Sequence, residues 1–292
     1  MRYTDAAAFR RALEDRLKAG AGGDGARIAR ERKRIAFDRL LARLVAVAPD
    51  QWLLKGGFAL DVRLADRARS TKDIDLDWPA ADEEVVDLLL EAATHQVGDY
   101  FVFAIERTTT PADRLGGSRR FRVDTALAGR PFETFLLDVG DHEPVGSAES
   151  LTMPDVLGFA GIAPVHVPAI SLAQQAAEKL HAYTRRYEGD RVSSRAKDLV
   201  DLVLIAELFP FGAGELRHAV EAIFTARGTH PRPVGLPRPP NEWAVPFRQL
   251  ASSVGVTGDL IEGHSIAAAL LDPVLDDRAT NRTWHPQNQE WR

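Results

Sequence analysis

Asp73-Ile74-Asp75-Leu76-Asp77 is the segment of this chain that is most informative about its fold. Its acidic and apolar residues alternate with a period of two, which predicts a β-strand with one buried face and one face of carboxylates. A strand rises about 3.3 Å per residue, so Asp73 and Asp75 project from one face about 6.6 Å apart. Two such carboxylates can share a cation, and oxygen-only ligands favour Mg²⁺, with Mn²⁺ as an alternative. A solvated edge strand explains the same pattern.

A glycine pair upstream of this strand predicts a phosphate site. Residues 52–54 are typical of a short buried strand and residues 58–64 of a helix, and Gly56-Gly57 lie between them. Glycine lets the backbone approach a phosphate closely, and a helix N-terminus supplies unpaired N–H groups. A plain tight turn is the alternative explanation.

Basic residues gather around the glycine pair and the acidic strand. Those in the connecting segment are Arg63, Arg67, Arg69 and Lys72. Their charges would neutralise a triphosphate, although Lys72 would project to the opposite face of a regular strand from Asp73. The predicted substrate-binding residues in this part of the chain are Lys55, Gly56, Gly57, Arg69 and Lys72.

A third carboxylate from a neighbouring strand would complete a two-metal site. Asp138 is the candidate, because it lies at the end of an otherwise apolar strand predicted over residues 132–139, where a carboxylate needs a reason. Asp124 and Glu133 also lie on nearby predicted strands. The identity of the third ligand therefore stays open at this point.

The predicted elements divide the chain into two parts. Helices are expected over 5–18, 26–48 and 82–95, and strands over 100–106, 120–127 and 132–139. Further helices are expected over 171–187, 196–208, 214–226 and 247–275. Prolines make 228–246 an extended connection, and the last dozen residues are expected to be loose. We predict an α/β (α+β) fold with a mixed-sheet domain over 1–165 and a helical domain over 166–292.

Composition narrows the class of protein. The chain has 292 residues, 45% hydrophobic and 27% charged, which is ordinary for a globular protein with ample core. It has no run of 18 apolar residues, and its N-terminus lacks the apolar core of a signal peptide. Because it has no cysteine, disulfides and thiolate metal sites are excluded, and a reducing cytoplasm is the expected compartment.

A basic segment is hidden by the net charge of −5. Residues 26–43 hold seven positive and two negative charges, a net of +5. The positive residues are Arg27, Arg30, Arg32, Lys33, Arg34, Arg39 and Arg43. They predict either a phosphate-attracting surface or a solvated helix face.

The second half offers a candidate pair of opposite charges. Asp198 and Asp201 share one face of a predicted helix, and flanking leucines place that face near the core, where an aspartate needs a cation. Lys179, in an amphipathic helix, is the candidate partner of Asp198. A helix-to-helix salt bridge and a catalytic role explain the pair equally well, and Lys179→Ala with normal melting but weakened activity would favour catalysis. His181 is predicted to lie at the edge of the core.

Five motifs occur together in one order. They are Lys55-Gly-Gly-Phe-Ala-Leu60, Arg69-Ser-Thr-Lys-Asp-Ile-Asp75, Leu137-Asp138, Glu178-Lys-Leu-His181 and Arg195-Ala-Lys-Asp-Leu-Val-Asp201. On these residues the chain resembles the AbiEii/AbiGii toxin family of DNA-polymerase-β-like nucleotidyltransferases, which includes the MenT-type toxins of mycobacteria. The resemblance covers about residues 30–245. The glycine pair and D-x-D are shared by the whole superfamily, whereas the lysine and R-x-K-D motifs are more specific to the toxins.

The resemblance implies roles for residues at matching positions. Gly56 and Gly57 would hold a nucleoside triphosphate, and Asp73 and Asp75 would bind metal. Lys179 and Asp198 would be the other essential polar residues. Thr71 or Ser70 lies where related toxins are phosphorylated for inhibition, and Phe58 stands where the superfamily often has serine.

The resemblance also implies an antitoxin partner and an acceptor. Some members transfer nucleotides, often pyrimidines, to the 3′ acceptor end of tRNA. We therefore expect an RNA 3′-hydroxyl to attack the α-phosphorus of a bound NTP, with Asp75 and Asp138 holding one ion and Asp73 and Asp75 the other. Arg195, with Arg185, Arg186, Arg191 and the basic helix, would contact RNA.

Two other functions stay open. In the first, the acceptor of the nucleotide is a small molecule or a protein side chain instead of RNA. In the second, the chain is a non-catalytic, NTP-binding regulatory module. A P-loop NTPase and a protein kinase are disfavoured, because the G-x-x-x-x-G-K-[ST], H-R-D and D-F-G motifs are absent.

Overall fold

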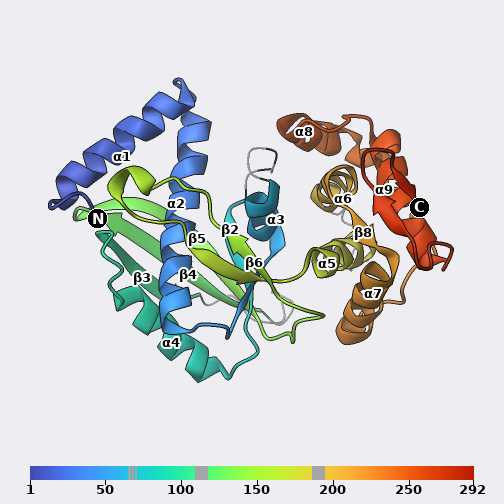
Figure 1. Cartoon of the computed structure of the whole chain (residues 1–292), viewed down its shortest axis with the longest axis horizontal. Coiled ribbons are helices and arrows are strands. Elements are labelled where there is room, and N and C mark those ends of the chain that lie inside the picture. Colours follow the sequence, from blue (N-terminus) through green and yellow to red (C-terminus); the bar gives the residue numbers. More distant parts are fainter. Residues whose placement is uncertain (65–66, 68, 70, 109–117, 186–194) are drawn as a thin grey trace. The chain divides into compact units, whose positions relative to one another are not determined.

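The computed structural model describes residues 1–64, 67, 69, 71–108, 118–185 and 195–292 (Figure 1). They form two compact units. The first, here called the sheet unit, contains Met1–Pro144 and Ala148–Ala169, and the second, the helical unit, contains Val145–Ser147 and Ile170–Arg292. The sequence-based assignments of Ser70, Arg186 and Arg191 lie outside the described residues.

Within the described residues of the sheet unit, seven strands form one mixed sheet in the order β3-β4-β5-β2-β1-β7-β6. The strands are β1 (Leu53–Lys55), β2 (Asp73–Asp77), β3 (Phe101–Arg107), β4 (Arg119–Leu127), β5 (Arg130–Gly140), β6 (Glu149–Thr152) and β7 (His166–Ala169). The acidic strand β2 lies in the interior of the sheet, parallel to β5 and antiparallel to β1. The mixed α/β prediction is therefore confirmed, and the solvated-edge explanation of β2 is wrong.

The two faces of this sheet differ in chemistry. Ile74 and Leu76 of β2 and Leu137 of β5 are fully buried in a core that also takes residues from four helices. These helices are α1 (Ala6–Ala21), α2 (Gly25–Val47), α3 (Gly56–Leu64) and α4 (Asp82–Thr94). Because side chains alternate along a strand, Asp73 and Asp75 project from the other face. Burial of the apolar face thus presents the carboxylates on the opposite side of the sheet.

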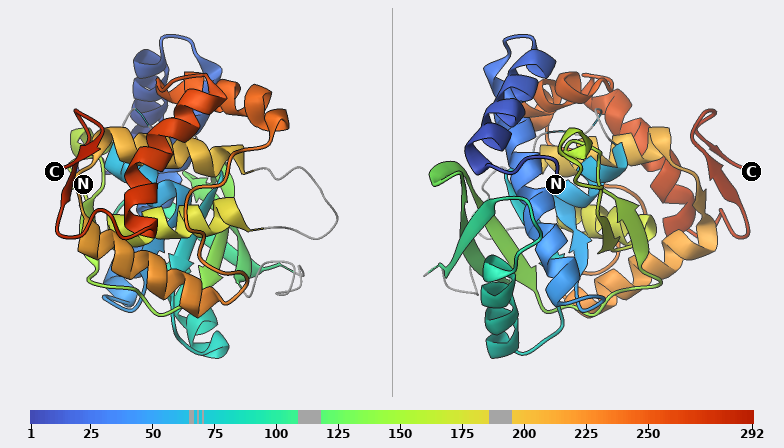
Figure 2. Two further views of the ribbon diagram at one scale, coloured as in Figure 1. Left: turned by 90° about the vertical axis from the view of Figure 1, so that its right-hand side faces the viewer. Right: turned by 60° about the vertical axis from the view of Figure 1, so that its left-hand side comes forward.

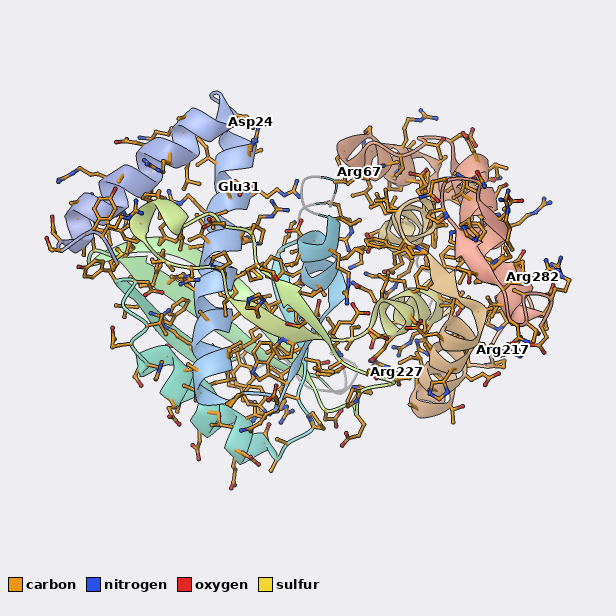
Figure 3. All side chains as sticks on the ribbon, in the orientation of Figure 1. Asp24, Glu31, Arg67, Arg217, Arg227 and Arg282 are labelled. Carbon is orange, nitrogen blue, oxygen red and sulfur yellow. The ribbon has the colours of Figure 1, made fainter. Side chains whose placement is uncertain are left out.

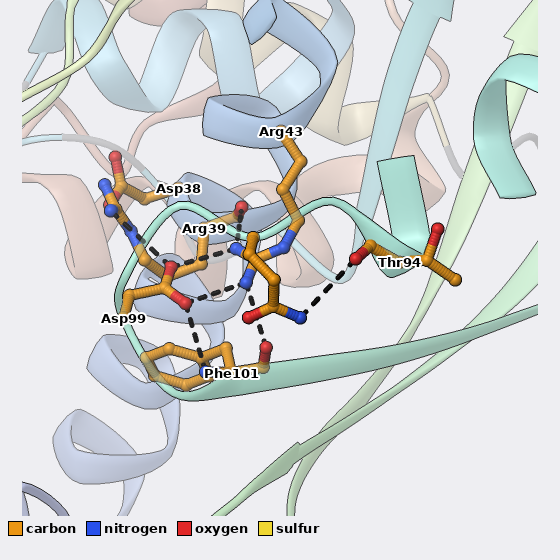
Figure 4. Close-up of polar contacts among 7 residues, drawn as sticks. Asp38, Arg39, Arg43, Thr94, Asp99 and Phe101 are labelled. Atoms are coloured by element: carbon orange, nitrogen blue, oxygen red, sulfur yellow. Dashed lines mark hydrogen bonds and ion pairs between the residues drawn. The ribbon is translucent and has the colours of Figure 1, made fainter. Parts of the chain in front are cut away.

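Basic residues of α2 take part in the core of the unit. Arg43 is fully buried, and its guanidinium donates to both carboxylate oxygens of Asp99 at 2.9 and 2.7 Å (Figure 4). Arg39, 3% exposed, donates to Asp38, whose pKa is raised by burial. Removing one partner of such a buried pair typically costs about 3–5 kcal/mol.

Two arginines nearer the N-terminus of α2 form ion pairs with helix α3 (Gly56–Leu64). Arg34 donates to both oxygens of the buried Asp61 at 2.6 and 2.7 Å, and Arg30 donates to the same carboxylate at 3.0 Å. Arg34 also pairs with Glu31, which is labelled in Figure 3. Packing therefore uses Arg34, Arg39 and Arg43 internally, whereas Arg27 is exposed and the side chains of Arg30, Arg32 and Lys33 are 24–25% exposed. A phosphate-attracting surface stays a prediction for the first turns of α2, and a solvated face does not describe the whole segment.

Helices α5 (Leu172–Thr184), α6 (Ala196–Leu208), α7 (Ala213–Arg227), α8 (Ala244–Val254) and α9 (Leu260–Leu275) belong to the helical unit (Figure 2). The helical prediction over 247–275 is confirmed except at residues 255–259, because Gly255 adopts a left-handed conformation (φ 72°) that ends α8. No described helix is long and apolar enough to cross a bilayer.

Two segments without helical pattern still pack against this unit. The proline-rich segment buries Leu236, and the Tyr183 hydroxyl donates to the carbonyl of Pro237 at 2.6 Å. The C-terminal segment is ordered, so the expectation of a loose end is wrong. Its strands β9 (Thr283–His285) and β10 (Glu290–Trp291) join β8 (Phe211–Gly212), and the buried Trp284 indole donates to a carbonyl of α6 at 2.8 Å.

Candidate functional site

The acidic strand meets the glycine pair at the first residue of α3. Gly56 has φ +66°, a left-handed conformation that costs other residues energy. A Cβ at Gly56 would overlap the Oδ2 atom of Asp75 and lie 2.7 Å from its Cγ. A plain tight turn explains the first constraint but not the second. The glycine is required because the Asp75 carboxylate lies against the helix N-terminus.

Gly57 is linked to the other carboxylate, that of Asp73, through the side chain of Thr71. A Cβ there would lie 2.9 Å from the Thr71 Oγ1 atom and 3.4 Å from an Arg69 guanidinium nitrogen. The Thr71 hydroxyl in turn donates to Asp73 Oδ1 at 3.2 Å. We call Gly56, Gly57, Asp73 and Asp75 the glycine–carboxylate junction. It joins the two predicted phosphate-binding glycines to the two predicted metal ligands.

Strand register places Asp138 beside this junction. In the parallel pairing of β2 with β5, Asp75 is directly opposite Asp138, so both side chains lie on the same face. Asp124 is instead opposite Thr134, and Glu133 pairs with Lys33 of α2. Of the three candidate carboxylates, Asp138 is the one that the sheet brings next to Asp75.

Asp138 already has a cationic partner. Arg120 of β4, opposite Asp138 in the antiparallel pairing, donates from Nε and Nη2 to the two carboxylate oxygens at 2.6 Å each. The pKa of Arg120 is raised, chiefly by these hydrogen bonds, and the charges of Asp73 and Asp75 add to the effect. Sequence reasoning missed Arg120, although the alternation of polar and apolar residues along β4 places it on the polar face.

The donor set at the junction suits a divalent cation only in part. Asp73 and Asp75 are partly exposed carboxylates on neighbouring positions of one face, and such oxygen ligands fit Mg²⁺ or Mn²⁺. Among the described residues, however, no group of three or more Asp, Glu or His side chains is assembled to hold a metal. Both oxygens of Asp138 accept hydrogen bonds from Arg120.

The predicted cations have different environments. Arg69 approaches Gly57, and Lys72 is exposed. Arg63 donates to Glu149 at 2.8 Å. The Lys55 ammonium forms an ion pair with Asp77, which is 1% exposed. A buried carboxylate needs such a partner, so Lys55 has a structural role that the sequence did not predict.

The helical unit brings the predicted pair Lys179 and Asp198 together and adds Asp201 and Arg195 to it. Lys179 of α5 lies 3.3 Å from Asp198 Oδ1 and 2.7 Å from Asp201 Oδ2, both on α6. Arg195 lies 3.2 Å from the other oxygen of Asp198. Asp198 and Asp201 are 2% and 0% exposed. Lys179 is therefore part of a buried network, and normal melting of Lys179→Ala is no longer expected.

His181 lies at the edge of the helical core, as the sequence predicts. It is 7% exposed, its Nε2 atom lies 2.9 Å from the Thr229 hydroxyl, and its ring packs 4.6 Å from that of His230. Burial lowers the pKa of His181 to about 4, and the nearby His230 acts in the same direction. The ring is neutral at pH 7 and serves packing.

Comparison with known proteins links both units to one family. A family model described as "Nucleotidyl transferase AbiEii toxin, Type IV TA system" matches residues 39–273. The nucleotidyltransferase toxin MenT4 from Mycobacterium tuberculosis H37Rv has a TM-score of 0.63 and 20% identity, covering 90% of this chain and 89% of that chain. JHP933 from Helicobacter pylori has a TM-score of 0.46 and 13% identity, covering 85% and 95%. A comparison with curated proteins found no match.

Proposed function

Because the chain belongs to the AbiEii nucleotidyl transferase toxin family, we propose that it transfers a nucleotide from an NTP to the 3′ end of an RNA. The proposed acceptor is the 3′ end of tRNA. The observation that carries the proposal is the contact of the Asp75 carboxylate with Gly56 at the start of α3. A phosphate-binding helix terminus and a cation-binding carboxylate are then adjacent, which is the arrangement that phosphoryl chemistry needs.

In this proposal each group of the junction has one task. The backbone N–H groups that begin α3 at Gly56 and Gly57 bind the triphosphate, and Arg69 offsets its charge. Asp73 and Asp75 hold divalent cations, Mg²⁺ or Mn²⁺, with Asp138 as the third ligand. Such ions, when bound, stabilise charge on the triphosphate and on the attacking oxygen.

The proposed reaction is a single substitution at phosphorus. The RNA 3′-hydroxyl oxygen forms a bond to the α-phosphorus, and its proton passes to solvent. The bond between the α-phosphorus and the bridging oxygen breaks, and pyrophosphate leaves. The chain contributes positioning and charge complementarity, which are the main sources of rate in this chemistry.

The two units receive different assignments. The sheet domain, residues 1–165, holds the nucleotide, and the helical domain, residues 166–292, supplies Lys179 and Asp198 as further essential residues. We also propose a cognate antitoxin as partner and the cytoplasm as compartment. Thr71 is a proposed point of inhibition, since its hydroxyl donates to Asp73 and a phosphate there would place like charge beside that carboxylate.

Labelled nucleotides test the acceptor. Purified protein is incubated with Mg²⁺, each α-³²P-labelled NTP in turn, and total tRNA or a tRNA-free lysate. Label at the RNA 3′ end supports the proposal. Label confined to protein or small molecules would replace the acceptor but keep the chemistry. Nucleotide binding without pyrophosphate release in any fraction would identify a regulatory module instead.

A further inference from the structure

Arg120 donates hydrogen bonds to both oxygens of Asp138, the carboxylate proposed as the third metal ligand. Its guanidinium forms a two-pronged contact with Asp138, which is the cross-sheet neighbour of Asp75. The charges of Asp73 and Asp75 also act on Arg120 and raise its pKa. Arg120 is thus the ion-pair partner of Asp138 and lies on the same sheet face as Asp73 and Asp75.

We propose that Arg120 is a built-in substitute for the divalent cation, which holds Asp138 in place until the incoming ion displaces it. The inference rests on the proposed function and deepens it, because it names a positioning residue that governs how the metal site assembles. Asp138 becomes a metal ligand only when Arg120 releases it.

Exposure makes this exchange feasible. The side chains of Arg120 and Asp138 are 28% and 14% exposed, so solvent reaches the pair. Water and salt screen a pair that solvent reaches, so its net contribution to stability is smaller than that of a fully buried pair. The Arg43–Asp99 pair, with side chains 0% and 1% exposed, is by contrast a fixed part of the core. Arg120 is therefore held strongly enough to order Asp138 but not strongly enough to exclude a divalent ion.

Charge balance gives the exchange its direction. Three neighbouring carboxylates repel one another, and the Arg120 guanidinium brings a single positive charge to this face. A divalent cation brings two charges to shorter contact distances, so it stabilises the acidic face better than Arg120 does. Removal of the arginine charge should therefore raise the affinity of the junction for a cation.

The same strand provides a matched control. Arg122 is two residues from Arg120 and, by alternation, on the same face of β4. It pairs with Asp124 at 2.9 Å instead, and this hydrogen bond is the chief cause of its raised pKa. Arg122→Gln removes one arginine charge from this face without freeing Asp138.

Mn²⁺ binding without nucleotide tests the inference, with free Mn²⁺ measured by electron paramagnetic resonance. Arg120→Gln should lower the Kd about tenfold, and Arg122→Gln should leave it nearly unchanged. In the double variant Arg120→Gln/Asp138→Asn the gain should disappear, because the released ligand is absent. Arg120→Lys, which keeps the charge but loses the fork, should give an intermediate Kd and covers the case in which Arg120→Gln does not fold.

The outcomes separate this inference from the proposed function. Equal Mn²⁺ affinity of wild type, Arg120→Gln and Arg120→Lys, or a gain that persists without Asp138, overturns the role of Arg120 but leaves the metal-dependent function intact. Absence of Mn²⁺ binding in every variant overturns both. Thermal melting of each protein shows that the compared samples are folded.

Discussion

Gly56 is a residue at which two independent constraints coincide. Its φ of +66° favours glycine, and the Asp75 carboxylate takes the space that a side chain would need. Phe58 explains the nearby departure from the serine common in the superfamily. Its ring is buried and packs edge-on to Phe37 of α2, 4.8 Å between centroids, so this position serves the core and not a phosphate.

Gly56→Ala should abolish turnover because the new Cβ displaces Asp75 from the helix terminus. The strained backbone alone costs about 1–2 kcal/mol. Gly129→Ala is the matched control, since Gly129 has φ +69° and open space around its missing Cβ. Both variants should melt lower, but only Gly56→Ala should lose pyrophosphate release. Equal activity of the two would show that the contact with Asp75 is unimportant.

Some residues of the site are visible in the sequence and others are not. Asp73 and Asp75 follow from alternation over five residues, and Gly56 from its place between two elements. Arg120 does not, because its contact with Asp138 depends on the register of two strands. The sequence marks Arg120 as polar-facing but cannot say which carboxylate it meets.

In helix α2, the charge of the sequence segment does not show which arginines are exposed. A net charge of +5 on one helix predicts an exposed cationic surface, yet Arg34 and Arg43 bind buried aspartates from α3 and from the segment before β3. Those partners are 27 and 56 residues away in the chain. Local composition cannot reveal long-range pairing, so the helix was predictable and its role was not.

Helices α5 and α6 give a prediction at the same scale. Lys179→Ala leaves Asp201 without the cation 2.7 Å away, and a broken buried pair costs about 3–5 kcal/mol, so the melting temperature should fall clearly. Lys179→Met/Asp201→Asn removes both charges and should recover most of the loss. If the stable double variant is inactive, Lys179 also serves the reaction. An unchanged melting temperature for Lys179→Ala would contradict the buried network.

At the scale of the whole molecule, helix periodicity and strand alternation predicted most elements, and the mixed α/β class is correct. The short strands β6 to β10 were missed, because two to four residues carry too little pattern. The C-terminal strands are ordered by Trp284 and Trp291, whose burial depends on α6 and α9. Because their sequence neighbours are polar, the sequence does not indicate that these two tryptophans are buried.

Global stability should depend on pH through His181. Its pKa is about 4 in the folded state and about 6.5 when unfolded, so the unfolded chain binds more protons between these values. The stability that the neutral His181 ring contributes is therefore fully present above pH 6.5. It is lost as the pH falls toward 4, and the free energy of unfolding should then decrease by about 1–2 kcal/mol, after allowance for the partial exposure of the ring to solvent. His230, Arg227 and Arg185 act on the ring in the same direction.

Urea unfolding at pH 7 and pH 5 measures this effect. The wild type should lose more stability on acidification than His181→Gln, whereas His218→Gln, at an exposed position of α7, should behave as wild type. Identical pH dependence of all three proteins would mean that His181 titrates alike in folded and unfolded chains.

In the proposed function, the carboxylates at the glycine pair perform the chemistry. Pyrophosphate release, with Mg²⁺, NTP and tRNA, is therefore compared among wild type, Asp75→Asn and Asp124→Asn, an aspartate of the same sheet that lies away from the junction. Asp75→Asn should be slower by about 100-fold or more at an unchanged melting temperature, and Asp124→Asn should match wild type. Full activity of a folded Asp75→Asn protein would contradict the account.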